Sequence, residues 1–308
     1  MIMNTKSTFR TALVTLAAAG CLMALGCRQK TVEPEMSDSV KLEAYDLGLE
    51  RHPNDHRLLA ARAQVLFNLG KVKEAAYDIT RAVELDPENL EYLLSKSDIV
   101  FANGSIEEAY RTLESAERLD PQNLDVQLKL GEITFYSRDY DRSLRYLTTV
   151  TEREPNNRTA LFMKGFIYKE KGDTASAVNL LRQVTDKFPD YAPAFEELGI
   201  LYATRQNPLA AEYLGTAIQL EPNNTNALYA LALFHQDAGN YDAAEALYRQ
   251  LLDINPNSAD AWHNLGYIEF TYYSDYNRAI EYFDRALAVD PSHPEALANR
   301  QLALDAQK

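Results

Sequence analysis

The side chains that could do chemistry are few in this chain and form no catalytic pattern. Among the five histidines, His52 and His56 have the four-residue spacing that can bring two metal ligands together on a helix. Pro53 lies between them and breaks such a helix, so the pair does not predict a metal site. Adjacent acids such as Glu196 and Glu197 point in different directions from a helix, and therefore do not form an acid/base dyad.

Sequence motifs of enzymes are also missing. The chain contains no glycine-rich phosphate loop, no His-Glu-x-x-His and no Gly-x-Ser-x-Gly. Its two cysteines, Cys21 and Cys27, both lie near the amino terminus, so the rest of the chain has no cysteine nucleophile, thiolate ligand or disulfide. These observations predict a protein that is not an enzyme and that binds no cofactor and no metal.

The net charge excludes one class of partner. Lys and Arg number 31, against 45 Asp and Glu, which gives a formal net charge of −14. Nucleic acids are bound through clustered Lys and Arg, and a surface of this charge repels the phosphate backbone. The sequence therefore predicts no nucleic-acid partner.

The first 36 residues differ in composition from the rest. Lys6 and Arg10 precede an uncharged run of sixteen residues that ends at Gly26, somewhat shorter than a membrane-spanning helix of about 20 apolar residues. The sequence Met-Ala-Leu-Gly-Cys at 23–27 resembles a bacterial lipobox. The resemblance implies a signal peptide at residues 1–26, lipid on Cys27, and a tether at 27–36 that reaches about 30 Å when extended.

Alternatives remain open for this segment. Cys21 follows small residues at 18–20 and is a second possible lipidation site, but cleavage there would leave an apolar tail before Cys27. A secreted protein without lipid, or an uncleaved anchor, is the other alternative. In each case the repeats described next are expected to be exported. Arg28 is not the aspartate that retains some lipoproteins in the inner membrane, which favours an outer-membrane lipoprotein.

Eight prolines recur at a nearly constant spacing and predict a repeated structure. Their separations are 34, 34, 34, 34, 33, 34 and 35 residues, for Pro53, Pro87, Pro121, Pro155, Pro189, Pro222, Pro256 and Pro291. About 34 residues is the length of one helix-turn-helix unit of a solenoid. Each proline ends a helix. Residues two positions later can cap the next helix, at Asn89, Asn123, Asn157, Asn224 and Ser258.

Small residues recur at two further positions of each unit. The first position holds Ala63, Ser97, Gly131, Gly165, Gly199, Ala232 and Gly266. The second, in the following helix, holds Ala75, Ala109, Ser143, Ala177, Ala210, Ala244 and Ala279. Two antiparallel helices approach closely only where neither carries a bulky side chain, so these positions predict the crossing point of each helix pair.

The combined pattern resembles the tetratricopeptide repeat, W-x2-L-G-x2-Y…A-x3-F…P. Trp262, Leu265 and Gly266 reproduce its first half, with Glu269 standing where an aromatic residue is usual. The resemblance implies an all-α fold, a right-handed α-solenoid (superhelix) of stacked antiparallel helix hairpins.

Residues 37–308 are predicted to form a single solenoid. The positions of the repeats divide it into three parts. A half-repeat at 37–55 is followed by seven repeats from 56 to 293 and a capping helix at 294–308. That last helix contains Arg300, Asp305 and Lys308, and we expect it to cover the final apolar face with a polar outer side.

The first helix of each repeat lines the concave face in this family, and the resemblance therefore implies where a partner binds. Its non-packing positions predict a groove with aromatic anchors at Phe67, Phe101, Phe135, Phe162, Phe166, Tyr229, Tyr267 and Phe270. Acidic or amide residues accompany them at Gln64, Asp98, Glu132 and Glu196. Such a groove suits a protein or peptide partner with apolar and basic residues. The alternative for each ring is packing between adjacent helices.

Two repeats depart from the common length. The turn at 205–208 is one residue short, and the seventh repeat is one residue long near Tyr272 and Tyr273. These tyrosines have no regular position in the repeat and form a second candidate contact patch. The alternative is that the extra residue fills a local gap.

Together, the lipobox and the repeats predict a non-enzymatic scaffold or adaptor, tethered to a membrane of the bacterial cell envelope. The chain resembles tetratricopeptide lipoproteins that assemble secretion, pilus, outer-membrane or cell-wall machinery. The alternative is a lipoprotein that binds a glycan or small molecule. Chaperone adaptors of the family use Lys and Asn to clamp acidic C-terminal tails, but those positions here hold residues such as Ala60 and Asp98, which disfavours that partner.

Overall fold

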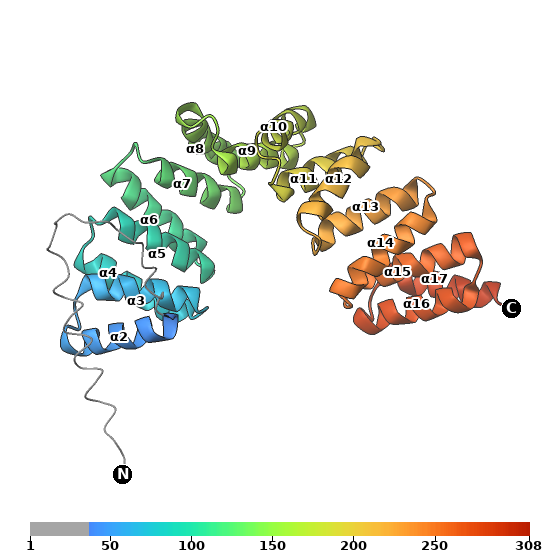
Figure 1. The fold of residues 1–308 in the computed structure, drawn as a ribbon, viewed down its shortest axis with the longest axis horizontal. Coiled ribbons are helices and arrows are strands. Elements are labelled where there is room, and N and C mark those ends of the chain that lie inside the picture. The colour runs from blue at the N-terminus through green and yellow to red at the C-terminus, as the bar shows by residue number, and fades with distance from the viewer. Residues whose placement is uncertain (1–36) are drawn as a thin grey trace, which may run out of the picture.

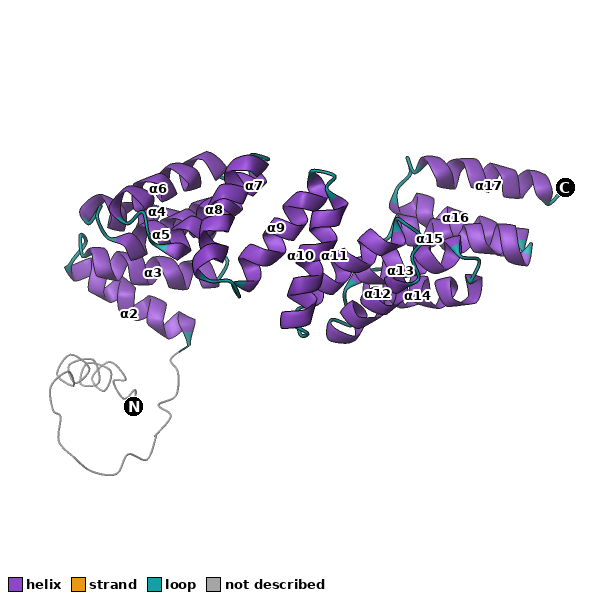
Figure 2. Cartoon of the chain, turned by 90° about the horizontal axis from the view of Figure 1, so that it is seen from above, coloured by secondary structure: helices purple, strands orange, loops and turns teal. Residues whose placement is uncertain are grey.

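A computed structural model describes residues 37–308 of the chain. Every regular element in this part is a helix, and no strand occurs in it (Figure 2). The predicted all-α solenoid is thereby confirmed. The predicted signal peptide, the lipidation site Cys27, its alternative Cys21 and the tether lie outside the described residues.

Seven helix pairs form the repeats. Their first helices are α3 (His56–Asn68), α5 (Leu90–Ala102), α7 (Leu124–Tyr136), α9 (Arg158–Glu170), α11 (Ala192–Ala203), α13 (Thr225–Asp237) and α15 (Ala259–Ile268). Their second helices are α4 (Val72–Leu85), α6 (Ile106–Leu119), α8 (Tyr140–Arg153), α10 (Thr174–Lys187), α12 (Leu209–Leu220), α14 (Tyr241–Ile254) and α16 (Tyr276–Val289). Helix α2 (Asp38–Arg51) precedes them and α17 (Pro294–Ala306) follows.

The pairs stack in chain order into an open arch with α2 at one end and α17 at the other (Figure 1). Each helix packs on the next in the chain, and several first helices also touch the first helix of a neighbouring repeat, as α7 touches α9 and α11 touches α13. Second helices of neighbouring repeats make fewer contacts with each other. The first helices therefore lie on the inner, concave side of the arch.

The helix starts follow the predicted caps. The side chains of Asn89, Asn123, Asn157, Asn224 and Ser258 each accept a hydrogen bond from a backbone amide in the first turn of α5, α7, α9, α13 and α15, respectively. These bonds satisfy amides that would otherwise lack a partner at the start of a helix. The five predicted caps are therefore confirmed.

The crossing points are as tight as the small residues predict. A Cβ added to Gly131 would lie 2.7 Å from Leu147 Cδ2, and one added to Gly266 would lie 2.6 Å from Phe283 Cε1. Both partner side chains are fully buried. Glycine at these positions lets the first helix lie directly on a large side chain of the second, which sets the spacing of each pair.

The last helix differs in part from the expectation. Helix α17 covers the preceding pair through Ala303, which is fully buried and packs in a cluster with Ala279 and Phe283. Its outer side is not uniformly polar, because Leu297 is 50% exposed and Leu302 is 54% exposed. The equivalent residue of the first repeat, Leu59, is instead buried in a cluster with residues of the second helix α4.

The backbone of the seventh repeat is irregular, whereas the turn of the fifth keeps the left-handed residue found in the other repeats. In the seventh, the extra residue is accommodated by a π-helical turn, η1 (Glu269–Tyr273), which ends at Ser274 with a left-handed φ of 57°. In the fifth, Gln206 has a φ of 53°, and Arg138 of the third repeat is likewise left-handed at the same turn position with a φ of 59°. Four other repeats use glycine at this left-handed position, as at Gly104, because glycine adopts it without steric cost.

We predict opposite effects from adding a methyl group to two neighbouring glycines. In Gly199→Ala, the new Cβ would lie 2.6 Å from Leu214 Cγ and 3.0 Å from the Leu214 backbone nitrogen. The resulting strain should lower the free energy of unfolding by about 1–3 kcal/mol.

Gly215→Ala is the matched control, because its Cβ would meet nothing within 4 Å. Higher helix propensity should raise stability there by roughly 0.5–1 kcal/mol. Urea unfolding followed by circular dichroism measures both. Equal effects of the two substitutions would show that the crossing is not a tight constraint.

Candidate partner-binding groove

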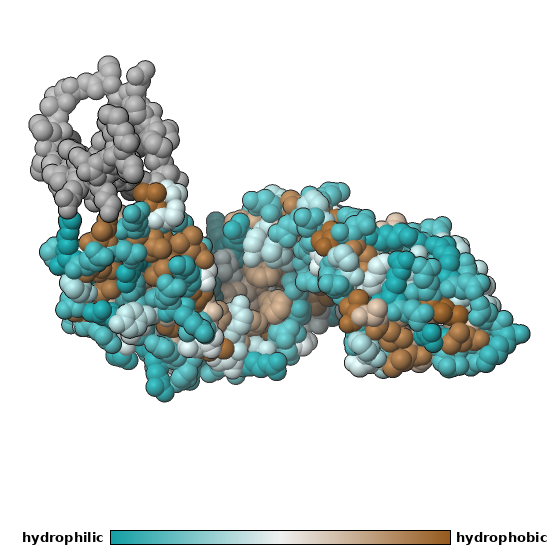
Figure 3. All heavy atoms as spheres, turned by 90° about the horizontal axis from the view of Figure 1, so that it is seen from below, coloured by the Kyte–Doolittle hydropathy of each residue, from teal (hydrophilic) through white to brown (hydrophobic). Residues whose placement is uncertain are grey.

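The three predicted phenylalanines Phe67, Phe101 and Phe135 occupy the same position on α3, α5 and α7. Each is half-buried and packs against the apolar core of its own repeat. The rings therefore contribute to helix packing, which was the alternative for each of them, and each also keeps part of its surface at the inner face. Figure 3 looks up into the arch and shows apolar residues in the recessed middle of this face.

The middle of the inner face carries a continuous row of aromatic rings, which we call the aromatic ladder. Successive centroids lie 5.0, 5.4, 5.5, 6.3 and 5.3 Å apart along Phe101, Tyr136, Phe135, Phe166, Phe162 and Tyr191. Three of these contacts are edge-to-face, with interplanar angles of 71°, 78° and 89°. Such pairs stabilise one another by roughly 0.5–1.5 kcal/mol each beyond the apolar surface they bury. The ladder links α5, α7, α9 and the start of α11.

Four members of the ladder were predicted from the sequence and two were missed. Tyr136, the last residue of α7, is 56% exposed and is the most solvent-accessible ring of the ladder. Tyr191 precedes α11 at the position where other repeats have a capping Asn, Asp or Ser, and it makes no side-chain cap. An aromatic residue at a position that usually holds a helix-capping residue was the sequence signal that could have identified Tyr191.

Two cations of the chain itself lie over ladder rings. Lys169 Nζ is 4.1 Å from the centroid of Phe166, and it also lies 2.6 Å from Glu197 Oε2. The guanidinium carbon of Arg158 is 4.6 Å from the centroid of Tyr191. Ring faces attract cations through the ring quadrupole, so the ladder is chemically suited to ammonium and guanidinium groups.

The acidic residues predicted beside the rings have different environments. Asp98 is ion-paired with Lys129, and Glu196 accepts a hydrogen bond of 2.8 Å from Asn224 Nδ2. Glu132 forms no hydrogen bond or ion pair with any residue in the part of the chain that the structure describes. Burial raises the pKa of Glu132, and the nearby charge of Lys129 opposes that shift.

The predicted aromatic residues of the carboxy-terminal repeats do not join the ladder. Tyr229 is half-buried, and its hydroxyl accepts a hydrogen bond of 3.2 Å from Asn264 Nδ2. Phe270 packs 5.7 Å from Tyr276 within its own repeat. Tyr267 is 37% exposed and lines an open pocket of about 480 Å³, together with Gln236, Asp237, Tyr241, His263, Asn264, Glu295 and Asn299.

The second candidate patch lies on the π-helical turn η1. Tyr272 is 52% exposed and Tyr273 is 42% exposed, and they contact each other at 4.8 Å. Both also touch the preceding repeat, because Tyr272 lies 4.6 Å from Tyr241 and the Tyr273 hydroxyl donates a hydrogen bond to Asp242. The two rings thus bridge neighbouring repeats and still present surface to solvent.

Glu269, at the position where the repeat usually has an aromatic residue, is buried. Its Oε1 lies 3.0 Å from Arg278 Nη2, whereas its Oε2 has no hydrogen-bond partner. Burial raises the pKa of this carboxyl, and Arg278 opposes the shift. The ion pair holds the π-helical turn against α16.

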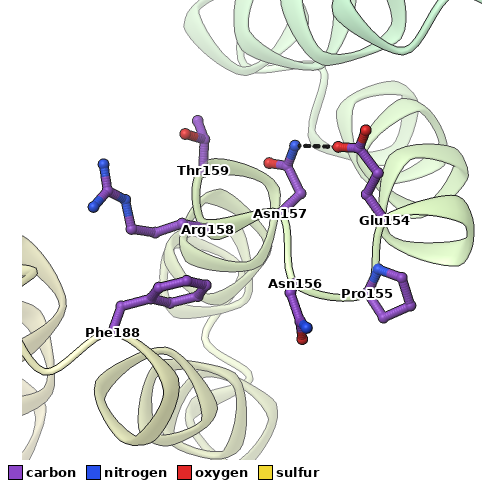
Figure 4. A pocket seen from close by; sticks show the side chains of 7 residues that line it. All are labelled: Glu154, Pro155, Asn156, Asn157, Arg158, Thr159 and Phe188. Carbon is purple, nitrogen blue, oxygen red and sulfur yellow. Dashed lines mark hydrogen bonds between the residues drawn. The ribbon is translucent and has the colours of Figure 1, made fainter.

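A shallow pocket of about 640 Å³ adjoins the end of the ladder, at the turn between α8 and α9 (Figure 4). The side chain of Phe188, which follows α10, extends toward that of Arg158, the residue whose guanidinium covers the Tyr191 ring. On the opposite side, Asn157 donates a hydrogen bond of 2.9 Å to Glu154. The pocket therefore places polar groups next to Arg158, at the Tyr191 end of the ladder.

Neither a metal site nor a membrane span is found between residues 37 and 308. No three His, Cys, Asp or Glu residues of this part are arranged to hold a metal ion. None of its helices combines the length and the apolar composition needed to cross a bilayer. His56, one of the two closely spaced histidines, instead lies with Nδ1 3.1 Å from the Tyr92 hydroxyl.

The fold, the repeat length and the crossing residues agree with comparisons to known families. Models described as tetratricopeptide repeat match residues 60–124, 159–191, 201–266 and 261–295. The chain belongs to the tetratricopeptide repeat family. This confirms the resemblance seen in the sequence.

Two curated proteins are similar to this tetratricopeptide repeat chain over short segments. A protein adenylyltransferase Fic from Aedes aegypti is 36% identical over 89 residues, which cover 27% of this chain and 18% of that protein. An uncharacterized protein y4yS from Sinorhizobium fredii is 39% identical over 56 residues, 18% of this chain and 31% of that protein. The chain thus spans less than a third of the length of either relative.

Solved structures show the same fold over most of the chain. The Cut9–Hcn1 hetero-tetramer of the APC/C has a TM-score of 0.63 at 18% identity, covering 85% of this chain and 52% of that one. A tetratricopeptide repeat protein from Parabacteroides merdae has a TM-score of 0.59 at 17% identity, covering 81% and 98%. Yeast Tom70 has a TM-score of 0.58 at 20% identity, covering 88% and 58%.

We predict that the two adjacent rings at the end of α7 differ in their contribution to stability. Phe135→Ala removes a half-buried ring that contacts the Leu147 core and three other rings, and should lower the free energy of unfolding by about 2–3 kcal/mol. Tyr136→Ala removes an exposed ring and should cost about 1 kcal/mol or less. Urea denaturation of both variants tests this, and a larger loss for Tyr136→Ala would contradict the assigned packing.

Proposed function

We propose that this protein is a non-enzymatic scaffold that binds protein partners through the inner face of its arch. The aromatic ladder is the observation that supports this most, because it combines a continuous apolar surface with an exposed ring at Tyr136. Aromatic rings are enriched at protein interfaces, where they bury large areas with little loss of side-chain entropy. One structure of similar fold, Cut9–Hcn1, is itself a protein assembly.

We also propose that the protein acts in the bacterial cell envelope. A lipid on Cys27 and a tether at 27–36 would hold the arch close to a bacterial membrane, with the outer membrane favoured. The lipobox-like sequence at 23–27 supports this part, together with the absence of any other cysteine besides Cys21. A scaffold in this position would assemble envelope machinery such as a secretion, pilus, outer-membrane or cell-wall complex.

The alternative function, capture of a glycan or small molecule, has its own support at the other end of the arch. The pocket beside Tyr267 combines rings with amide and carboxylate side chains, a combination that suits a hydroxylated ligand. This pocket shares no residue with the aromatic ladder. A variant of the ladder therefore separates the two functions.

We predict that Tyr136→Ala loses specific protein partners when the tagged protein is captured from crosslinked cell envelopes. Tyr77→Ala is the matched control, because Tyr77 is 63% exposed on the second helix α4, away from the inner face. Quantitative mass spectrometry after affinity capture should show at least one partner lost from the first variant and retained by the second. Identical partner profiles for wild type and Tyr136→Ala would exclude the ladder as the binding surface.

We also predict that lipid attachment depends on one cysteine. In a bacterial host, Cys27→Ser should abolish labelling with an alkyne fatty acid and move the protein from the membrane fraction to the soluble fraction. Cys21→Ser should retain both the label and the membrane location. The reverse result would assign lipidation to Cys21, and labelling of neither form would refute the lipoprotein proposal.

A further inference from the structure

The chain shows in its own structure how the inner face binds an ammonium group. Lys169 Nζ lies over the face of Phe166 at 4.1 Å and contacts the Glu197 carboxylate at 2.6 Å. The two charged side chains are only 22% and 15% exposed. A cation held between a ring and a carboxylate, partly shielded from water, is thus a stable arrangement on this surface.

One repeat toward the amino terminus, the same two chemical groups are present without a cation between them. Glu132 lies on α7 one turn before Phe135 and Tyr136, so the three side chains share one side of the helix. Phe101 extends the ring surface, since it contacts Tyr136 at 5.0 Å. Glu132 itself is half-buried and has no ion-pair or hydrogen-bond partner among residues 37–308.

The charged groups around Glu132 do not neutralise it. Lys129 is the nearest cation and is already ion-paired with Asp98, and Asp98 adds a second negative charge that acts on Glu132. Partial burial raises the pKa of Glu132, because the ionised carboxylate is less well solvated there than in water. A half-buried carboxylate without a paired cation lowers stability, and a cation supplied by a bound partner would offset that cost.

We propose that Glu132, with Phe101, Phe135 and Tyr136, forms a subsite for a lysine or arginine side chain of the bound protein partner. The partner's cation would contact the Glu132 carboxylate while its aliphatic stem lies along the ring surface. This rests on the proposed function of the groove and specifies the chemistry of the partner: a segment that places a basic residue among apolar ones. The net charge of −14 favours such a partner through long-range attraction.

The test uses a fluorescein-labelled peptide of alternating lysine and leucine as the probe, and fluorescence anisotropy as the readout. Glu132→Gln should weaken binding of the probe about tenfold, as expected for the loss of one partly buried charge pair. Glu84→Gln removes the same charge from an exposed position of the second helix α4 and should leave binding unchanged. The acetyl-lysine form of the probe should bind more weakly to the wild type and should not distinguish the variants.

Stability measurements separate this role from a structural one. Because folding raises the pKa of Glu132, its ionised form reduces stability above that pKa, and the effect disappears as the pH falls and the carboxyl is protonated. Glu132→Gln should therefore be at least as stable as the wild type at pH 7. Any gain should shrink as the pH falls through the raised pKa of Glu132, and it should be gone below about pH 4, near the ordinary pKa of a glutamate.

Three results would overturn the subsite. Equal loss of probe binding in Glu132→Gln and Glu84→Gln would show general electrostatic attraction. Unfolding of Glu132→Gln at lower urea concentration than the wild type would show a structural role. Unchanged probe binding in Glu132→Gln, while Tyr136→Ala still loses its partners, would refute the subsite and leave the proposed scaffold function standing.

Discussion

The close crossing of the two helices in each repeat is the constraint on which the rest of the structure depends. At Gly131 and Gly266 there is no room for a Cβ, because a fully buried side chain of the second helix lies directly against the first. This contact fixes the spacing of those pairs, the small residues Ala63, Ser97 and Ala232 take the same position in the three pairs that lack a glycine there, and repetition of the pair generates the arch (Figure 1). It also decides that the first helices, and not the second, present their remaining side chains on the inner face.

The aromatic ladder follows from that arrangement. Rings on neighbouring first helices come within contact distance, so residues about 30 apart in sequence, such as Phe135 and Phe166, become neighbours. The same rings fill space between repeats and face the inside of the arch, so the side chains proposed to contact a partner also stabilise the fold. Tyr136 and Glu132 are exposed or half-buried and contribute less to packing. We therefore expect that they can be substituted without disrupting the core.

Much of this could be predicted from the sequence because the determinants are local and repeated. Proline spacing, caps such as Asn123 and small residues such as Gly199 predicted the helices and their crossings. The contacts between repeats were harder to predict from the sequence, because the angle between successive helix pairs decides whether Tyr136 and Tyr191 reach the ladder. The open apolar side of α17 was missed because polar residues elsewhere on that helix suggested a complete cap. The binding roles of the predicted groove residues stay predictions.

The central claim is that a protein partner contacts the inner face of the arch at the aromatic ladder. Incorporation of the photocrosslinking amino acid p-benzoylphenylalanine at position 136, and separately at the exposed outer position 77, tests it most directly in living cells. The account predicts a discrete crosslinked adduct with a partner from position 136 and none from position 77. Adducts from position 77 alone, or none from position 136, would contradict it.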